Sequence, residues 1–296
     1  MELKKIDEKV FFKYKACRTV KDIEWTKDCL KNKYYYFSQP HQLNDPFDCQ
    51  LKVSLNASKR IIKKWLCKNN KNSDKQLSVE DVQRLVNNSE TLFQSYLKDN
   101  QTIRSMFHIL SLTDKDKDEV MWSLYANYNS GLTIGYKTSL FNIDRKHYAL
   151  PLKQISVDPN KLLLEGFIFT FGDRQYTYLK KVKYGIDNKH IFSPYSDNKK
   201  NYIYSIFHKK ENWKTESEFR ALLSSANPKD NIKDLRVFYP DDVLAEITFG
   251  EKMDKSLMKD FYELVTTSYS TTVKFFIAKV DYENFIIKKI PYEPEK

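Results

Sequence analysis

The chain has 296 residues, a net charge of +11 and 41% hydrophobic residues, which suits one large domain or two smaller ones. The first glycine is Gly131, and neither G-x-G-x-x-G nor G-x-x-x-x-G-K-[ST] occurs, so the Rossmann and P-loop phosphate motifs are excluded. No apolar run reaches the roughly 18 residues that span a membrane.

The positive charge favours polyanionic partners such as nucleic acid. However, the lysines are dispersed, and an AT-rich genome would explain their number equally well. The four cysteines form no Cys-x-x-Cys pair, which argues against a zinc site. The first residues lack the apolar segment of a signal peptide. We therefore expect a cytoplasmic protein with free thiols.

The amino-terminal part predicts a strand over 10–15, a helix capped by Thr19 and an aromatic strand over 34–38. A loop over 39–48 follows, because prolines interrupt strand pairing there.

Three polar residues of this loop, Asn44, Asp45 and Asp48, surround Pro46 and can bond nearby backbone. Two interpretations stay open for them. The turn is either purely structural, or it holds a polar ligand beside the second strand.

The segment over 58–100 has a helical pattern, with Ser78 and Asp81 in the spacing of a cap. We interpret about 56–105 as a helical insertion into the fold. It carries no residues that we assign to a catalytic site.

A strand over 107–112, a helix over 120–126 and a strand from Gly131 come next. Trp122 and Tyr125 are three apart on that helix and share a face. Such a pair either packs in the core or stacks on a planar ligand.

Later segments predict four strands, over 162–171, 178–184, 243–249 and 273–280, and one helix over 253–262. An apolar turn is expected over 202–207. Strands mix with helices without a regular βαβ repeat, which indicates an α+β fold with mixed, mostly antiparallel sheets. We expect a single domain over 1–296.

The densest set of chemical groups is Glu216, Glu218 and Arg220, in a stretch with the period-two pattern of a strand. On a strand, the three side chains share one face. They form either a solvated surface ion pair or a carboxylate pair held in a cleft, where Arg220 would keep a carboxylate ionised.

Five motifs in order resemble a widespread bacterial family, domain of unknown function 2971. They are Lys13-Tyr14-Lys15, Phe37-Ser38 with Asn44-Asp45-Pro46-Phe47-Asp48, Met121-Trp122-Ser-Leu-Tyr125-Ala with Gly131, Val182-Lys-Tyr184, and Trp213-x-x-Glu216-x-Glu218-x-Arg220. The resemblance covers Phe12 to Gly250. The family often has arginine where this chain has Lys15.

This family is similar to the ADP-ribosyltransferases, which implies sheets of that type and NAD as a substrate. By this resemblance Glu218 stabilises the ribose cation and Glu216 orients the acceptor. The implied NAD contacts are Tyr14, Lys15, Ser38, Asn44, Asp45, Trp122 and Tyr125, with Asp48 and Arg220 as structural support and no metal. The acceptor is then a protein or nucleic acid, and the role that of a toxin or phage-defence effector.

Two alternatives remain. One is a non-enzymatic nucleic-acid-binding or interaction protein that depends on the charge of +11. The other is a metal-dependent nuclease that uses Asp45, Asp48, Glu216 and Glu218, because such enzymes need converging carboxylates. The five histidines show no ligand spacing. The sequence does not indicate an oligomeric state.

Overall fold

A computed structural model describes residues 5–50, 52–53, 58, 60–61, 64, 78–81, 101–102, 104–141, 147–157, 167–185, 191–192, 201–225, 232 and 234–295. Most of the expected helical insertion lies outside these residues. At its described part, Ser78 and Asp81 form the predicted cap, because each backbone N–H donates to the other side chain, over 3.0 and 3.1 Å.

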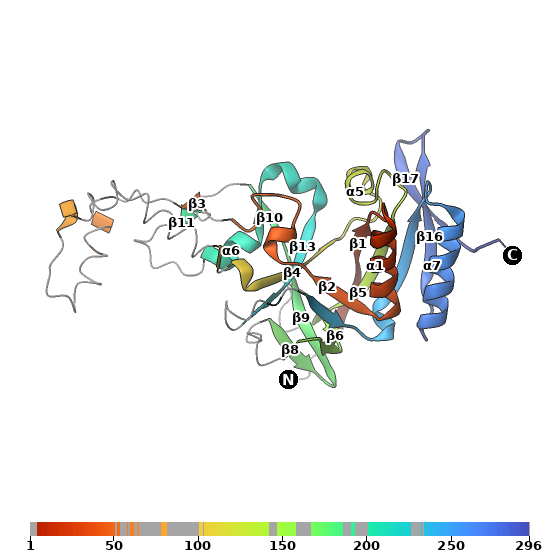
Figure 1. The fold of residues 1–296 in the computed structure, drawn as a ribbon, viewed down its shortest axis with the longest axis horizontal. Coiled ribbons are helices and arrows are strands. Elements are labelled where there is room, and N and C mark those ends of the chain that lie inside the picture. Colours follow the sequence, from red (N-terminus) through yellow and green to blue (C-terminus); the bar gives the residue numbers. More distant parts are fainter. Residues whose placement is uncertain are drawn as a thin grey trace.

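One large sheet dominates the described chain (Figure 1). Its order is β1 (Lys5–Lys15), β4 (Phe107–Thr113), β13 (Glu218–Ser224), β9 (Arg174–Lys181), β6 (Tyr148–Leu152), β5 (Leu132–Phe141), β15 (Leu244–Gly250), β16 (Lys274–Asp281) and β17 (Ile286–Pro291), with β8 (Ile168–Phe171) paired to β9. All these pairs are antiparallel except β15 with β16. Because β1 also pairs with β5, six strands form a closed ring. Around the ring they follow the order β1, β4, β13, β9, β6 and β5.

Smaller sheets surround this ring. One contains β2 (Tyr34–Phe37), β14 (Leu235–Phe238) and β7 (Gln154–Ile155), and parallel pairs join β10 (Lys183–Tyr184) to β12 (His208–Lys209) and β3 (Lys52–Val53) to β11 (Ile191–Phe192). The chain after β2 stays next to the ring, because Ser38 forms an isolated bridge with Ile109 of β4.

The helices lie outside the sheets. Among the described residues they are α1 (Val20–Lys31), α5 (Glu119–Tyr125), α6 (Asn201–Ile206) and α7 (Lys255–Ser268), with short 3-10 helices η1 (Pro40–Gln42), η5 (Glu211–Glu216) and η7 (Asp241–Val243). α1 and α7 run side by side (Figure 1), joined by an ion pair of 3.0 Å between Lys27 and Asp260. Thr19 caps α1 as predicted, through a reciprocal capping box with Asp22.

The main core fills the interior between the ring and α7. Phe11 of β1 and Phe219 of β13 meet edge to face with ring centroids 4.6 Å apart, and both are buried. A second, smaller cluster packs Tyr14 against Trp122 of α5. The face of β1 that carries Phe11 thus contributes to the main core, and Tyr14 anchors α5 next to the strand.

The predicted α+β class with mixed, mostly antiparallel sheets is confirmed. Two local predictions are wrong. Residues 202–207 are not a turn, because α6 covers most of them. Glu216 is not on a strand: η5 ends there, Ser217 adopts a left-handed conformation with φ 44° and ψ 46°, and β13 begins only at Glu218.

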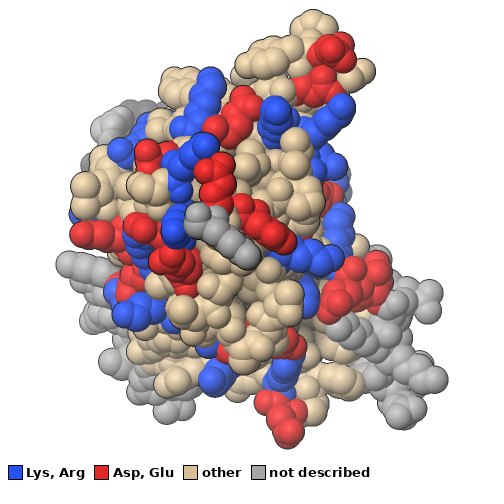
Figure 2. All heavy atoms as spheres, turned by 90° about the vertical axis from the view of Figure 1, so that its right-hand side faces the viewer, with Lys and Arg blue, Asp and Glu red and all other residues tan. Residues whose placement is uncertain are grey.

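The positive charge is not concentrated on the face that carries α7 and β17. Figure 2 shows lysine and arginine interleaved with aspartate and glutamate across that face. No helix in the described ranges has the length and apolar character needed to cross a membrane.

Candidate active site

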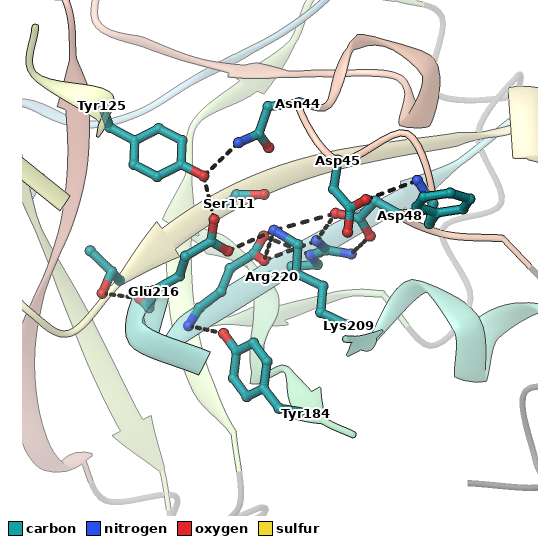
Figure 3. Close-up of polar contacts among 12 residues, drawn as sticks. Asn44, Asp45, Asp48, Ser111, Tyr125, Tyr184, Lys209, Glu216 and Arg220 are labelled. Carbon is teal, nitrogen blue, oxygen red and sulfur yellow. Dashed lines mark hydrogen bonds and ion pairs between the residues drawn. The ribbon is translucent and has the colours of Figure 1, made fainter. Parts of the chain in front are cut away.

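A cavity of about 240 Å³ opens where β1, β4 and β13 meet the loop after β2. Seven of the residues predicted as site or support residues line it, namely Tyr14, Ser38, Asn44, Asp48, Tyr125, Glu216 and Glu218. They come from separate parts of the sequence: two lie on strands of the ring, in β1 and β13, and the other five lie in the loop after β2, in α5 and in η5. Figure 3 shows the polar contacts of four of them, Asn44, Asp48, Tyr125 and Glu216, together with Lys209 and Arg220.

The two glutamates reach the cavity by different local structures. The backbone N–H of Glu218 donates to the hydroxyl of Tyr184 over 2.8 Å, which fixes the start of β13. The carbonyl of Glu216 accepts from the hydroxyl of Thr113 over 2.7 Å, which holds the end of η5 on β4. The left-handed Ser217 between them turns the chain, so both side chains face the same space despite the break in the strand.

Arg220 has no exposed surface, and all five of its N–H groups are used. Its Nε and Nη2 donate to the two oxygens of Glu218 over 2.7 and 2.9 Å, and its Nη1 and Nη2 donate to Asp48 over 2.8 and 2.5 Å. The remaining Nη1 proton faces the carbonyl of Ile206 at 2.5 Å. Arg220 therefore connects the Asn44–Asp48 loop to β13, in the structural role expected for it and for Asp48.

Lys209 is a second buried cation, and the sequence reasoning did not identify it. Its Nζ lies 2.6 Å from Glu216, 3.2 Å from Glu218 and 3.5 Å from Asp48. Burial opposes its charge, but Glu218 and Asp48 raise its pKa above the ordinary value. No motif marks this lysine, because β12 is brought to the site by its pairing with β10.

The pKa values of the two carboxyl groups are shifted in opposite directions. Burial acts to raise the pKa of Glu218, but the charges of Arg220 and Lys209 prevail and lower it to about 2. For Glu216, burial raises the pKa, the negative charge of Glu218 adds to that, and Lys209 opposes it without reversing it. Glu218 is therefore ionised at neutral pH, whereas Glu216 is the group closer to taking up a proton.

A directed hydrogen-bond chain runs to Glu216 from the loop. Tyr125 donates its hydroxyl proton to Glu216 Oε1, because an ionised carboxylate can only accept. The lone pairs of that hydroxyl accept from the side-chain amide of Asn44 over 2.6 Å. Since the single hydroxyl proton is already used, Asn44 must present its nitrogen, and an aspartate at this position could not make the same contact.

Lys13 is a cation with few partners. Its Nζ donates to the carbonyl of Ser111 over 3.0 Å and forms no ion pair with a described residue. Burial, and then the charge of Lys15, lower the pKa of Lys13 to about 8. Lys15 does not line the main cavity. It lines an adjoining cavity of about 80 Å³, which shares Lys13 and Ser38 with the first.

Besides Lys15, two expected ligand contacts lie outside the main cavity. Trp122 is 1% exposed, packs edge-on against Tyr14 with centroids 5.3 Å apart, and donates its indole N–H to the carbonyl of Asp116. It does not line the cavity, so it belongs to the core. Asp45 is also buried outside the cavity, where it accepts from the backbone N–H of Phe47 over 2.9 Å in an Asx-turn.

Two cations at the site, Lys13 and Lys209, were not predicted from the sequence, and only Lys13 had a signal there. Lys13 stands in the quoted Lys13-Tyr14-Lys15 motif, and on a strand it shares a face with Lys15. Gly131, in another motif, is required for packing, because a Cβ there would lie 2.1 Å from the Lys15 carbonyl oxygen. Ser111, whose carbonyl binds Lys13, had no motif at all.

Comparison with known proteins gives one match. No curated protein and no solved structure matches the chain. Residues 121–221 match the family model described as protein of unknown function (DUF2971), about a third of the chain. The matched segment includes Tyr125, Lys209, both glutamates and Arg220, and supports the family that the motifs indicate.

Proposed function

We propose that the protein cleaves the nicotinamide–ribose bond of NAD and transfers the ADP-ribose to a macromolecule. The observation that carries this proposal is the pair of buried carboxyl groups in one cavity whose pKa values are shifted apart. Glycosyl-transfer enzymes use such a pair, one group permanently charged and the other able to exchange a proton. The proposal also rests on the resemblance to ADP-ribosyltransferases.

Glu218 has the properties required for the first role. When nicotinamide leaves with the bonding electrons, the ribose becomes an oxocarbenium-like cation that a fixed negative charge stabilises. Arg220 and Lys209 hold the Glu218 carboxylate ionised and immobile at the cavity wall. No reorganisation of this group is then needed during the reaction.

Glu216 has the properties required for the second role. It accepts a proton from the acceptor as the acceptor attacks the ribose, and its raised pKa favours that uptake over the case of an ordinary exposed glutamate. When Glu216 is ionised, the three carboxylates around Lys209 and Arg220 exceed the two cations by one charge. These five groups are therefore net negative when a cation forms beside them, and Lys13 in the same cavity offsets that charge until a ligand anion pairs with it.

Lys13 supplies a place for the diphosphate. Its ammonium faces the cavity without a carboxylate partner among the described residues, and Lys15 lies on the same face of β1. We assign to Lys13 the contact that the resemblance suggested for Lys15. Lys15 is placed to take part only through the adjoining cavity.

The nuclease alternative has less support from this geometry. Asp48, Glu216 and Glu218 already have cationic partners at 2.5–3.5 Å, where a catalytic metal ion would need their oxygens. The resemblance makes a protein or nucleic acid the acceptor, and a toxin or phage-defence effector the cellular role.

The test is nicotinamide release, measured by mass spectrometry after incubation of the purified protein with NAD, with and without EDTA. We expect release that persists in EDTA and is lost in Glu218→Gln. Nucleic-acid cleavage that EDTA abolishes would support the nuclease instead. The assay is repeated with a cell extract added as a source of acceptor. Absence of both activities under these conditions too would overturn the proposal.

A further inference from the structure

The cavity is too small for a whole dinucleotide. Its volume is about 240 Å³, whereas sites that enclose drug-sized ligands measure about 300–1,000 Å³. A ligand of the size of NAD must therefore extend over the rim. Trp122, the residue expected to stack on a base, lies in the core and cannot meet that part of the ligand.

An exposed aromatic residue lies in the loop between two residues that line the cavity, Asn44 and Asp48. This residue, Phe47, is 61% exposed, although Asp45 and Asp48 of the same loop are buried. Single exposed apolar residues are common on protein surfaces. Exposure by itself therefore does not distinguish Phe47, but two further properties do.

The first property is rigidity. Pro46 fixes the backbone before Phe47, and the N–H of Phe47 is held by the Asp45 carboxylate. The carboxylate of Asp48, just after it, is bound to Arg220 by two hydrogen bonds. The ring is thus presented to solvent by a preorganised turn, which lowers the entropy cost of stacking on it.

The second property is an adjacent cation. Lys210 places its ammonium 3.7 Å from the centroid of the Phe47 ring and forms no ion pair with a described residue. Lys210 directly follows Lys209, which contacts the two glutamates and lies next to Asp48 in Figure 3. The ammonium covers one face of the exposed ring, so a base would stack on the opposite face and its neighbouring phosphate would reach Lys210, which has no carboxylate partner among the described residues.

We propose that Phe47 and Lys210 form a platform at the cavity rim, where Phe47 stacks on a nucleobase and Lys210 binds the phosphate next to it. This inference deepens the proposed function and rests on it in taking the ligand to be a nucleotide. The same chemistry is present in the adenylate half of NAD and in a nucleic-acid acceptor, and the experiment separates the two.

Calorimetric titration of the full chain with NAD, AMP, nicotinamide mononucleotide and a ten-nucleotide single-stranded DNA provides the test. The variants are Phe47→Ala, Phe47→Leu as an apolar control without a ring, Phe47→Trp as an aromatic control that keeps stacking, and Lys210→Met. All of them keep the backbone N–H that Asp45 binds, and thermal unfolding checks that each one is folded. Loss of a stacked base weakens binding by about 5- to 150-fold.

If the adenylate of NAD is the ligand, Phe47→Ala and Phe47→Leu weaken the binding of NAD and AMP, whereas Phe47→Trp binds them like wild type. The affinity for nicotinamide mononucleotide is then the same in all variants. If an acceptor nucleic acid is the ligand, the same variants weaken the oligonucleotide and leave NAD unchanged. In either case Lys210→Met weakens the affected probe and reduces its salt dependence.

The platform is overturned if no probe binds the wild-type protein at millimolar concentration, if Phe47→Ala changes no affinity, or if Phe47→Leu binds like wild type. Nicotinamide release, measured on the same samples, keeps the two ideas separate. Phe47-dependent AMP binding without any nicotinamide release would refute the proposed function and leave the platform standing.

Discussion

Arg220 and Lys13 are two cations at the same site with opposite surroundings. Arg220 uses every N–H group it has, on two carboxylates and a carbonyl, and has no exposed surface. Lys13 makes one hydrogen bond and no ion pair with a described residue. A saturated buried cation holds the fold together, whereas an unsaturated cation in a cavity is available to a ligand.

Replacing Arg220 tests the first half of this comparison, and the effect should be the largest. Arg220→Ala leaves Asp48 and Glu218 buried with reduced compensation, so we expect a loss of about 3–5 kcal/mol in the free energy of unfolding. Urea unfolding followed by circular dichroism measures it. Lys13→Met is the matched control, because it removes a cation from the cavity that Asp48 and Glu218 line without leaving a paired carboxylate behind. An equal loss in both variants would abolish the distinction.

The next largest effect should be the different loss of activity when each of the two glutamates is replaced. Glu218→Gln removes the fixed charge and should reduce both hydrolysis and transfer by about 100- to 1,000-fold. Glu216→Gln should lose transfer while some NAD hydrolysis remains, because only proton uptake from the acceptor is removed. Nicotinamide release and labelled ADP-ribose incorporation measure the two reactions. Wild-type activity in both variants would mean that the carboxylate pair has no catalytic role.

The pH dependence of stability sharpens the description of Lys13. Its pKa is lowered from 10.5 to about 8 in the folded protein, so between these values the unfolded chain binds more protons. Stability contributed by this residue therefore rises as the pH increases through that window. Urea unfolding at pH 7, 8, 9 and 10 should show this rise in wild type relative to Lys13→Met. Parallel curves for the two proteins would contradict it.

The smallest effect concerns Asn44, which is exposed. In Asn44→Asp the new carboxylate competes for the hydroxyl proton of Tyr125, so Glu216 loses a donor and its pKa rises further. The acidic limb of the pH–rate profile should move to higher pH. Asn44→Ala, which adds no acceptor, should move it less. The shift should vanish in Tyr125→Phe, and a shift that persists there would show that Tyr125 does not transmit the effect.

Local patterns in the sequence predicted much of the fold. The N-cap at Thr19, the aromatic strand at β2 and the Asx-turn at Asp45 depend on neighbouring residues, so their signals lie within a few positions. The strand assigned to Glu216 failed because Ser217 takes a positive φ without being glycine. Its conformation is stabilised by a contact with Asp114, 103 residues away, and no local pattern contains that information.

The site was predictable in part for the same reason. Glu216, Glu218 and Tyr125 stood out because they belong to motifs, and they line one cavity. Lys209 did not, because its importance comes from three carboxylates on other elements. Trp122 is buried and Phe47 is exposed, because burial depends on how α5 packs against Tyr14 and how the loop packs against Arg220.

The closed ring of strands has a consequence for synthesis on the ribosome. β1 is the first described strand to emerge, and the ring needs β13, which ends at Ser224, to be completed. Both glutamates also belong to this late part of the chain. Because chains grow from the amino terminus at about 5–20 residues per second, every nascent chain that ends before Glu218 lacks at least one of the two glutamates. The proposed transferase activity can then arise only after residue 218 has been translated and the ring has closed.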